Sequence, residues 1–253
     1  MAILTCDGVN LYYEVHGSGP VILLTHGYSA TSAMWRPQIK ALSNNHKLVL
    51  WDMRGHGASD YPEDQRLYSE AATIEDMAAI LDAVGAQSAI VGGLSLGGYM
   101  TLAFNLVHPE RVRALLIIDT GPGFKNDSAR EQWNQTARTT ADQLRTKGLS
   151  YLQEQSPERA MSTHRSADGL VRSAIGMLTQ RDARVINSLG GIKVPSLVIV
   201  GANDTPFLAA SDYMARKTPR ARKRVIADAG HAVNIDRPAE FNREVLEFIE
   251  TLN

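Results

Sequence analysis

The sequence predicts an α/β protein: a mostly parallel sheet flanked by helices, with a block of helices inserted into it. Short β-rich runs alternate with helical patterns through most of the 253 residues, which is typical of a parallel sheet covered on both faces. Several of these runs are continuously apolar, as expected for strands buried on both sides. Between Gly121 and Gly191 the alternation stops and no strand-like run occurs.

Composition narrows the classes of function. The chain is 44% hydrophobic and carries 26 Lys and Arg against 27 Asp and Glu, a net charge of −1. This favours a globular protein with a buried core and argues against nucleic acid or an anionic membrane surface as a partner. The single cysteine excludes an intramolecular disulfide and a cysteine-based metal cage. Without a signal peptide pattern or an apolar run of membrane-spanning length, we expect a cytoplasmic protein with a small-molecule partner.

The elements expected before residue 121 follow from hydrophobic periodicity and glycine or proline stops. A helix is predicted around 74–81 and ends at Gly85, and a second runs from Tyr99 to Val107, before Pro109. The strands expected in this part are 11–15, 21–25, 47–51, 88–91 and 114–118.

The middle of the chain is predicted to be a helical cap over residues 121–191, inserted into a core of residues 1–120 and 192–253. Ser128 and Glu131 match a capping box, and Gly148 supplies a helix stop. A further helix is expected over 170–179. The core then resumes with strands at 196–200 and 224–226 and a final amphipathic helix over 238–252.

The chemistry is expected at Gly93-Leu94-Ser95-Leu96-Gly97, a G-x-S-x-G motif where a predicted strand turns into a helix. A nucleophilic serine at such a turn occupies a strained backbone conformation, and small residues two positions either side let neighbouring backbone approach. The N-terminus of the following helix favours a developing oxyanion. Ser95 is therefore the predicted nucleophile.

A serine hydroxyl needs a base to accept its proton, and the base needs an orienting carboxylate. Asp204 follows the strand ending at 200, and His231 lies in the loop between the last strand and the final helix. We predict Ser95, Asp204 and His231 as the catalytic triad. Asp119, at the end of the strand 114–118, is the rival acid, and we interpret it as a carboxylate that caps the loop ahead of Thr120-Gly121.

The oxyanion hole is predicted from two backbone N–H groups, those of Leu96 and Tyr28. Tyr28 follows Gly27 in the loop after the strand 21–25. His26 beside it is interpreted as a packed residue that holds the loop. Asp52, Arg54 and His56 lie on one short loop and by themselves could suggest an anion site. His16, His46, His108 and His164 have no companions at metal-ligand spacing, and no metal site is predicted.

The cap offers apolar side chains for a substrate pocket, and the candidates are Phe124, Trp133, Met161 and Met177, with Leu178 beside them. At helical spacing such residues more often pack a helix onto its neighbours. The cap also carries ten Lys and Arg against seven Asp and Glu. An inward-facing arginine would recognise a carboxylate, although a solvated helix face is the ordinary role of such residues.

These motifs together resemble the α/β-hydrolase superfamily, in its capped esterase and enol-lactonase-like branch. The matching residues span nearly the whole chain and are His26-Gly27, the run from Asp52 to Ser59, the elbow around Ser95, Gly201-Ala202-Asn203-Asp204 and Gly230-His231. The resemblance implies an eight-stranded sheet, a helical cap over the active site, and hydrolysis through an acyl-enzyme without metal or cofactor. It also implies that an Arg and an Asp brace the loop of Asp52, Arg54 and His56, so these three residues are interpreted as structural.

The resulting hypothesis is a serine hydrolase that cleaves a carboxylic ester or a lactone. Two alternatives stay open: a carbon–carbon bond hydrolase with the same triad and cap, and a ligand receptor that retains the triad but turns over slowly. A carboxylate nucleophile, as dehalogenases and epoxide hydrolases of this fold require, is absent from the elbow, where Ser95 stands. The acyl and alcohol groups of the substrate and the oligomeric state are left open by the sequence.

Overall fold

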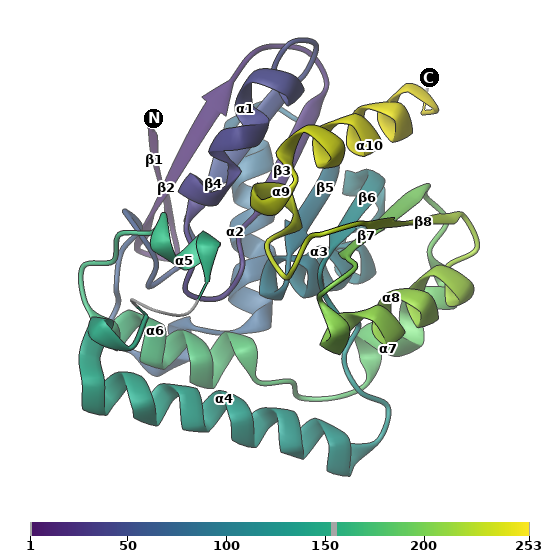
Figure 1. Ribbon diagram of the computed structural model, residues 1–253. Coiled ribbons are helices and arrows are strands. Elements are labelled where there is room, and N and C mark those ends of the chain that lie inside the picture. Colours follow the sequence, from purple (N-terminus) through teal and green to yellow (C-terminus); the bar gives the residue numbers. More distant parts are fainter. Residues whose placement is uncertain (1, 153–155, 253) are drawn as a thin grey trace.

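The computed structural model describes residues 2–152 and 156–252, whose strands form one eight-stranded sheet (Figure 1). The strand order is β1-β2-β4-β3-β5-β6-β7-β8; β2 is antiparallel to both of its neighbours, and the other pairs are parallel. The strands are β1 (Ala2–Cys6), β2 (Val9–His16), β3 (Val21–Thr25), β4 (Lys47–Trp51), β5 (Ala89–Leu94), β6 (Val112–Ile118), β7 (Ser196–Gly201) and β8 (Ala221–Ile226). The predicted mostly parallel sheet is confirmed.

The central strands form because their residues suit burial on both faces. Every residue of β3, β5 and β7 is buried, and Val, Ile and Leu dominate these runs, as in sheets covered on both sides. The edge strand β8 reads Ala-Arg-Lys-Arg-Val-Ile and is mostly exposed. Its charged residues disfavour pairing with the edge of another sheet.

Helices cover the sheet on both faces, and each face has its own hydrophobic cluster. Met77 and Leu102, from α2 and α3, belong to one cluster; Leu42 and Phe241, from α1 and α10, belong to the other. Figure 1 shows α1, α9 and α10 on the near side of the sheet and α2 and α3 behind it. The bounds are α1 (Arg36–Leu42), α2 (Glu70–Ala83), α3 (Leu96–Val107), α8 (Thr205–Lys217), α9 (Val233–Asp236) and α10 (Pro238–Glu250).

The described part of the chain between β6 and β7, here called the helical segment, consists of helices joined by loops, with short 3-10 turns at Gly148–Leu152 and Leu189–Gly191. Much of it runs along the lower edge of Figure 1. Its elements are α4 (Asp127–Lys147), α5 (Pro157–Ala160), α6 (Ala167–Ser173), a π-helical turn (Ala174–Leu178) and α7 (Arg184–Ser188). The helix predicted over 170–179 is thus divided between α6 and the π-helical turn. Assignment of residues 121–191 to a separate cap domain stays a prediction.

The start of α4 differs from the predicted capping box. Asn126 is the N-cap, and its side chain accepts a hydrogen bond from the Ala129 N–H at 3.1 Å. Ser128 therefore lies inside the first turn, and the prediction that it caps the helix is wrong. Asn and Ser are both favourable N-cap residues, and the chain enters the helix two residues before the predicted cap. The predicted stop is confirmed, because Gly148 is the C-cap with φ +62°.

Among the described residues, none of the helices combines the length and the hydrophobicity needed to cross a membrane.

Candidate active site

Ser95 lies at the turn between β5 and α3, in a backbone conformation that few non-glycine residues adopt. Its φ is 55° and its ψ is −116°. Such a conformation costs on the order of 1–3 kcal/mol and persists only where the surroundings hold it. The Ser95 N–H donates to the Ile118 carbonyl at 3.0 Å, and the Thr120 hydroxyl donates to the Ser95 carbonyl at 2.6 Å. The end of β6 therefore holds the strained turn on both sides of Ser95.

Two glycines leave the space that this turn needs. A Cβ on Gly93 would lie 2.8 Å from the Thr25 carbonyl oxygen, and a Cβ on Gly97 would lie 2.6 Å from the His26 carbonyl oxygen. Real Cβ atoms do not approach backbone oxygens so closely, and backbone cannot move aside as a flexible side chain can. The predicted requirement for small residues at both positions is confirmed.

Asp204 and His231 meet through a hydrogen bond. Asp204 follows β7 and precedes α8, and His231 lies in the loop between β8 and α9. The His231 Nδ1 and the Asp204 Oδ2 are 2.8 Å apart, and Asp204 is buried. Because a carboxylate only accepts, Nδ1 carries the proton, which leaves Nε2 as the acceptor. The Phe207 ring stacks on the imidazole, with centroids 5.1 Å apart and 24° between planes.

Ser95 and Phe207, the residue whose ring stacks on His231, line the same cavity. Within the described residues the Ser95 hydroxyl makes no hydrogen bond, so its link to His231 stays a prediction. Catalytic hydrogen bonds of this kind are often loose without substrate and shorten in the reacting complex.

Asp119, the rival acid, supports the backbone around His231 rather than its own loop. It is fully buried, with φ +43°. Its Oδ1 accepts from the Gly201 N–H at 2.9 Å, and its Oδ2 accepts from the Val233 N–H at 3.3 Å. Burial raises the pKa of Asp119 well above its usual range, and the charge of the neighbouring Asp204 adds to the rise. The interpretation that Asp119 caps the loop at Thr120-Gly121 is wrong, because strand pairing turns its carboxylate toward β7 and α9.

The loop after β3 lies against the nucleophile. A Cβ on Gly27 would lie 3.5 Å from the Ser95 Cβ. The N–H groups of Tyr28 and Leu96, the two predicted oxyanion donors, make no hydrogen bond to another described residue. The Tyr28 hydroxyl donates to the Leu170 carbonyl of α6 at 2.8 Å. Tyr28 therefore anchors the helical segment to this loop, a role that the sequence alone did not reveal.

Two buried histidines fix this loop to the loop after β4. The Met53 N–H donates to the His26 Nε2 at 3.0 Å, and the His26 Nδ1 lies 2.7 Å from the Gly27 carbonyl oxygen. The Ser29 N–H donates to the His56 Nε2 at 3.2 Å. Each ring accepts an N–H, so each is neutral. Burial lowers the pKa of His26 to about 4 and that of His56 well below its usual range.

His164 connects the same loops to the helical segment. Its Nε2 donates to the Ser29 carbonyl at 2.9 Å, while its Nδ1 accepts from the Gly57 N–H at 3.3 Å. Its ring centroid lies 5.8 Å from that of His56. Burial lowers the pKa of His164 too. The three histidines therefore hold structure around the site.

Charged side chains brace the loop after β4. Asp52 and Arg54, although two residues apart in sequence, bind different partners. Arg54 forms a buried, two-pronged ion pair with Asp76 of α2, through hydrogen bonds of 2.7 Å each. Asp52 instead accepts from the N–H groups of Ser32 and Ala58, at 2.7 and 2.9 Å. No local sequence pattern indicates that Asp76 pairs with Arg54, because the two residues are 22 positions apart.

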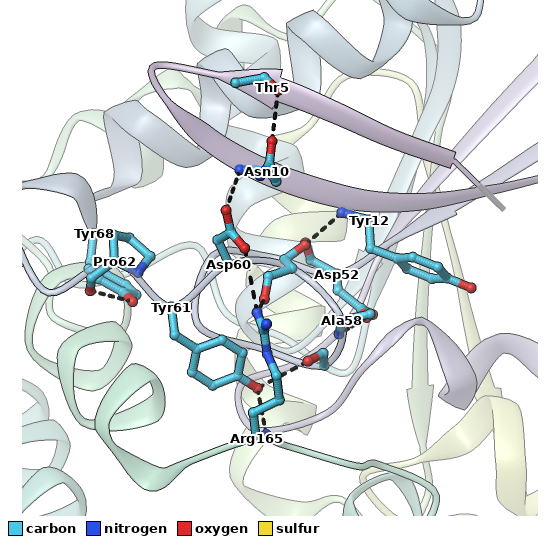
Figure 2. A network of polar contacts seen from close by, with 12 residues as sticks. Thr5, Asn10, Tyr12, Asp52, Ala58, Asp60, Tyr61, Pro62, Tyr68 and Arg165 are labelled. Atoms are coloured by element: carbon cyan, nitrogen blue, oxygen red, sulfur yellow. Dashed lines mark hydrogen bonds and ion pairs between the residues drawn. The ribbon is translucent and has the colours of Figure 1, made fainter.

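A third anchor of the helical segment appears in Figure 2, where Arg165 reaches the loop after β4. Its guanidinium lies 4.6 Å from the Tyr61 ring centroid and donates to the Ser59 carbonyl, and its N–H donates to the Tyr61 hydroxyl at 3.1 Å. Asp60 continues the network to the β1–β2 hairpin by accepting from the Asn10 N–H at 3.0 Å. The segment over the site is therefore attached at Tyr28, His164 and Arg165.

A cavity of about 310 Å³ lies between Ser95 and the helical segment. Its lining consists of Ser95, Leu96, Tyr99, Thr120, Gly121, Pro122, Gly123, Phe124, Trp133, Leu178, Gln180, Pro206, Phe207 and Ala210. Two of the four predicted pocket residues, Phe124 and Trp133, line it, and Leu178 does as well. The lining includes none of the ten Lys and Arg side chains of residues 121–191, all of which the structure describes.

The prediction that Met161 and Met177 line the pocket is wrong. Met177 is buried in a hydrophobic cluster, where its sulfur accepts from the Ser173 hydroxyl at 3.2 Å. Met161 follows α5, outside the cavity lining. Apolar cap residues can pack inward or face substrate, and helical spacing does not distinguish the two. Sequence reasoning missed Tyr99, Gln180 and Phe207 as lining residues.

Comparison with known proteins identifies the same fold as the sheet and the serine turn described above. The family described as alpha/beta hydrolase fold matches residues 20–185. A protein from Azorhizobium caulinodans, named as a candidate carbamate hydrolase, is 30% identical, with 94% of each chain covered. The enol-lactonase from Burkholderia xenovorans has a TM-score of 0.80 at 25% identity, covering 98% of this chain and 100% of that one.

A thermophilic esterase from Thermogutta terrifontis has a TM-score of 0.84 at 25% identity, with 99% of this chain and 97% of that chain covered. The family match extends over more than half of the sequence and includes the elbow at Ser95. The eight-stranded sheet and the glycine-flanked serine turn are what that family implies. The chain belongs to the α/β-hydrolase family.

Proposed function

We propose that this protein is a serine hydrolase that cleaves a carboxylic ester or a lactone through an acyl-enzyme. Two observations carry the proposal. Ser95 lies at a strained turn next to two backbone N–H groups that make no hydrogen bond to another described residue, and the buried Asp204 carboxylate is hydrogen-bonded to the partly exposed His231 imidazole. Relatives named as an esterase and an enol-lactonase support ester and lactone bonds as the substrates.

In the first half of the reaction, the His231 Nε2 removes the proton from the Ser95 Oγ as that oxygen attacks the substrate carbonyl. The negative charge that develops on the carbonyl oxygen is bound by the N–H groups of Tyr28 and Leu96, at the N-terminus of α3. His231 then donates its proton to the leaving alkoxide, so that an alcohol departs and the acyl group stays on Ser95.

In the second half, water attacks the acyl-enzyme while His231 removes its proton, and the same imidazole returns a proton to Ser95. Asp204 fixes the imidazole by its 2.8 Å hydrogen bond and stabilises its positive charge. For a lactone, the alcohol and the acid stay in one molecule, and the bonds formed and broken are the same.

Steady-state hydrolysis of short 4-nitrophenyl esters tests the proposal. We expect Ser95→Ala to lose turnover, and Asp204→Asn to lower kcat by about 10⁴-fold, because the wrong histidine tautomer is then favoured. Rapid release of many product molecules per protein chain supports an enzyme. A single burst of one product molecule per chain supports a ligand receptor that turns over slowly. Full activity of the Ser95→Ala variant contradicts the proposal.

A carbamate is the second candidate substrate, on the ground of the 30% identical relative. Its carbonyl can be attacked by the same serine, with an amine or ammonia as the leaving group. Parallel kcat/KM values for matched alkyl esters and carbamates decide between the two, and a higher value for the carbamate would replace the ester assignment.

A further inference from the structure

Phe207 lies beside His231, in the first turn of α8. Asp204 is the N-cap of this helix, and the Phe207 N–H donates to the Asp204 carbonyl at 3.0 Å. Residues three apart on a helix lie side by side, so both side chains can reach the same neighbour. Asp204 accepts a hydrogen bond from the His231 Nδ1, and the Phe207 ring stacks on the face of the same imidazole. One helical turn therefore holds His231 by its edge and by its face.

The Phe207 ring also forms part of the cavity wall. Phe207 is partly exposed, and a Cβ on Gly121 would lie 3.9 Å from two of its ring carbons, so the ring extends toward the loop after β6. An apolar wall does not require an aromatic ring here, because the aliphatic side chains of Leu178 and Ala210 line the same cavity. An aromatic ring adds the negative electrostatic potential of its face, which here is directed at the imidazole.

His231 becomes positively charged in each half of the proposed reaction, when it accepts a proton from Ser95 or from water. A cation within about 6 Å of an aromatic ring centre is attracted to the ring face, and the centroids of Phe207 and His231 are 5.1 Å apart. The N-terminal end of α8 opposes this charge, because helix N-termini are partly positive. Asp204 offsets that effect at the Nδ1 edge of the imidazole, and Phe207 is placed to offset it at the ring face.

We propose that Phe207 is a positioning residue for the hydrolytic reaction, and that its ring face stabilises the imidazolium form of His231. This inference rests on the proposed function, because it assigns Phe207 a role in the same reaction. Without the aromatic face, His231 accepts a proton less readily and is a weaker base toward Ser95 and toward water. Formation and breakdown of the acyl-enzyme should therefore both become slower.

A proton NMR titration of the His231 ring tests the contact directly. It is carried out in the Ser95→Ala variant, so that the measurement does not depend on turnover. Adding Phe207→Leu should lower the midpoint of the His231 titration by about half a pH unit, equivalent to about threefold weaker proton binding. Phe207→Tyr retains the aromatic face and should retain the midpoint. Phe207→Met supplies a second non-aromatic side chain should Phe207→Leu not fold.

These substitutions alter no charge around the imidazole. The titratable and charged groups on the loop of His231, on α8 and α9 and at the end of β6 include Asp204, Asp119, Asp236 and the Asp228–Arg237 ion pair. All of them are the same in the compared proteins. A change in the midpoint therefore reports the ring and not a neighbouring charge.

The pH dependence of 4-nitrophenyl acetate hydrolysis tests the consequence for the reaction. Phe207→Leu should lower kcat about threefold at pH 8, and its acidic limb of kcat/KM should lie about half a pH unit lower. Phe124→Leu is the matched control, because Phe124 lines the same cavity but its ring contacts Trp133 and not His231. Its acidic limb should coincide with that of the wild type, whatever the change in KM. Thermal unfolding at pH 5.5 confirms that each variant is folded.

Two results overturn the inference: equal His231 midpoints with Phe207 and with Leu at this position, or an acidic limb that moves as far in Phe124→Leu as in Phe207→Leu. A midpoint in Phe207→Tyr equal to that of Phe207→Leu also contradicts it, because the aromatic face would then have no effect. None of these results bears on the proposed function, which fails separately if ester hydrolysis does not require Ser95.

Discussion

Acidification should destabilise the protein by protonating histidines that the native structure holds neutral, and His26 gives the clearest magnitude. Burial lowers the pKa of His26 to about 4, whereas an unfolded histidine titrates at about 6.5. Between these values the unfolded chain binds a proton that the native protein does not, so stability falls as the pH falls. At 1.36 kcal/mol per pKa unit, His26 contributes about 2.5 kcal/mol of loss at pH 4.5 and about 3.4 kcal/mol well below pH 4.

The physical reason is that protonation removes an acceptor as well as adding a buried charge. The His26 Nε2 accepts from the Met53 N–H, and the positively charged ring could no longer do so. His56 and His164 act in the same direction, since burial lowers the pKa of each. The three histidines that gain a proton therefore lie around the loop that carries Tyr28, one of the two proposed oxyanion donors, and hold the helical segment to it.

Urea unfolding at pH 7 and pH 4.5 measures this effect in the wild type, in His26→Gln and in His16→Gln. The glutamine at position 26 does not titrate, so the stability that His26→Gln loses between the two pH values should be smaller than the wild-type loss by about 2.5 kcal/mol. His16, a partly exposed residue of β2, is the control and should behave as the wild type. Equal losses in the wild type and His26→Gln would refute the reasoning.

Three further predictions concern residues around the site. Gly97→Ala should destabilise the fold by about 1–3 kcal/mol in urea unfolding, because its Cβ meets backbone; wild-type stability would contradict the close approach. Arg54→Met leaves the Asp76 carboxylate buried and unpaired, and thermal unfolding should show a loss of about 3–5 kcal/mol, whereas a loss under 1 kcal/mol would contradict it. Tyr28→Phe removes the bond to the Leu170 carbonyl, and should cost about 1 kcal/mol and speed hydrogen exchange in α6; unchanged exchange there would argue against the anchor.

The sheet could be predicted closely because its strands carry strong local signals. The predicted bounds 21–25 and 47–51 are those of β3 and β4, which are runs of apolar residues bounded by turns and polar residues. The glycines that flank Ser95 were also identifiable, because the turn type demands them.

The helical segment was less predictable, because several residues there satisfy the same local rule. Asn126 and Ser128 can both cap a helix, and only the path of the chain into α4 selects Asn126. Phe124 and Met177 are both apolar residues of the segment, yet the first lines the cavity and the second packs into a core cluster.

Apart from the Asp204–His231 pair, the contacts between distant parts of the sequence that surround the site could not be inferred. The pair Arg54–Asp76 and the bonds of Asp119 to Gly201 and Val233 depend on how the strands assemble. Gln180 is an ordinary polar residue in sequence, and only the folded chain shows that it lines the cavity. Side-chain direction in irregular segments has no periodic signal.

The most direct test of the central claim, that Ser95 is the acylated nucleophile, is fluorophosphonate labelling followed by peptide mass spectrometry. We predict one adduct per chain, located on Ser95, with labelling slowed by Asp204→Asn and abolished by Ser95→Ala. An adduct on another residue, or labelling of the Ser95→Ala variant at the wild-type rate, would contradict the account.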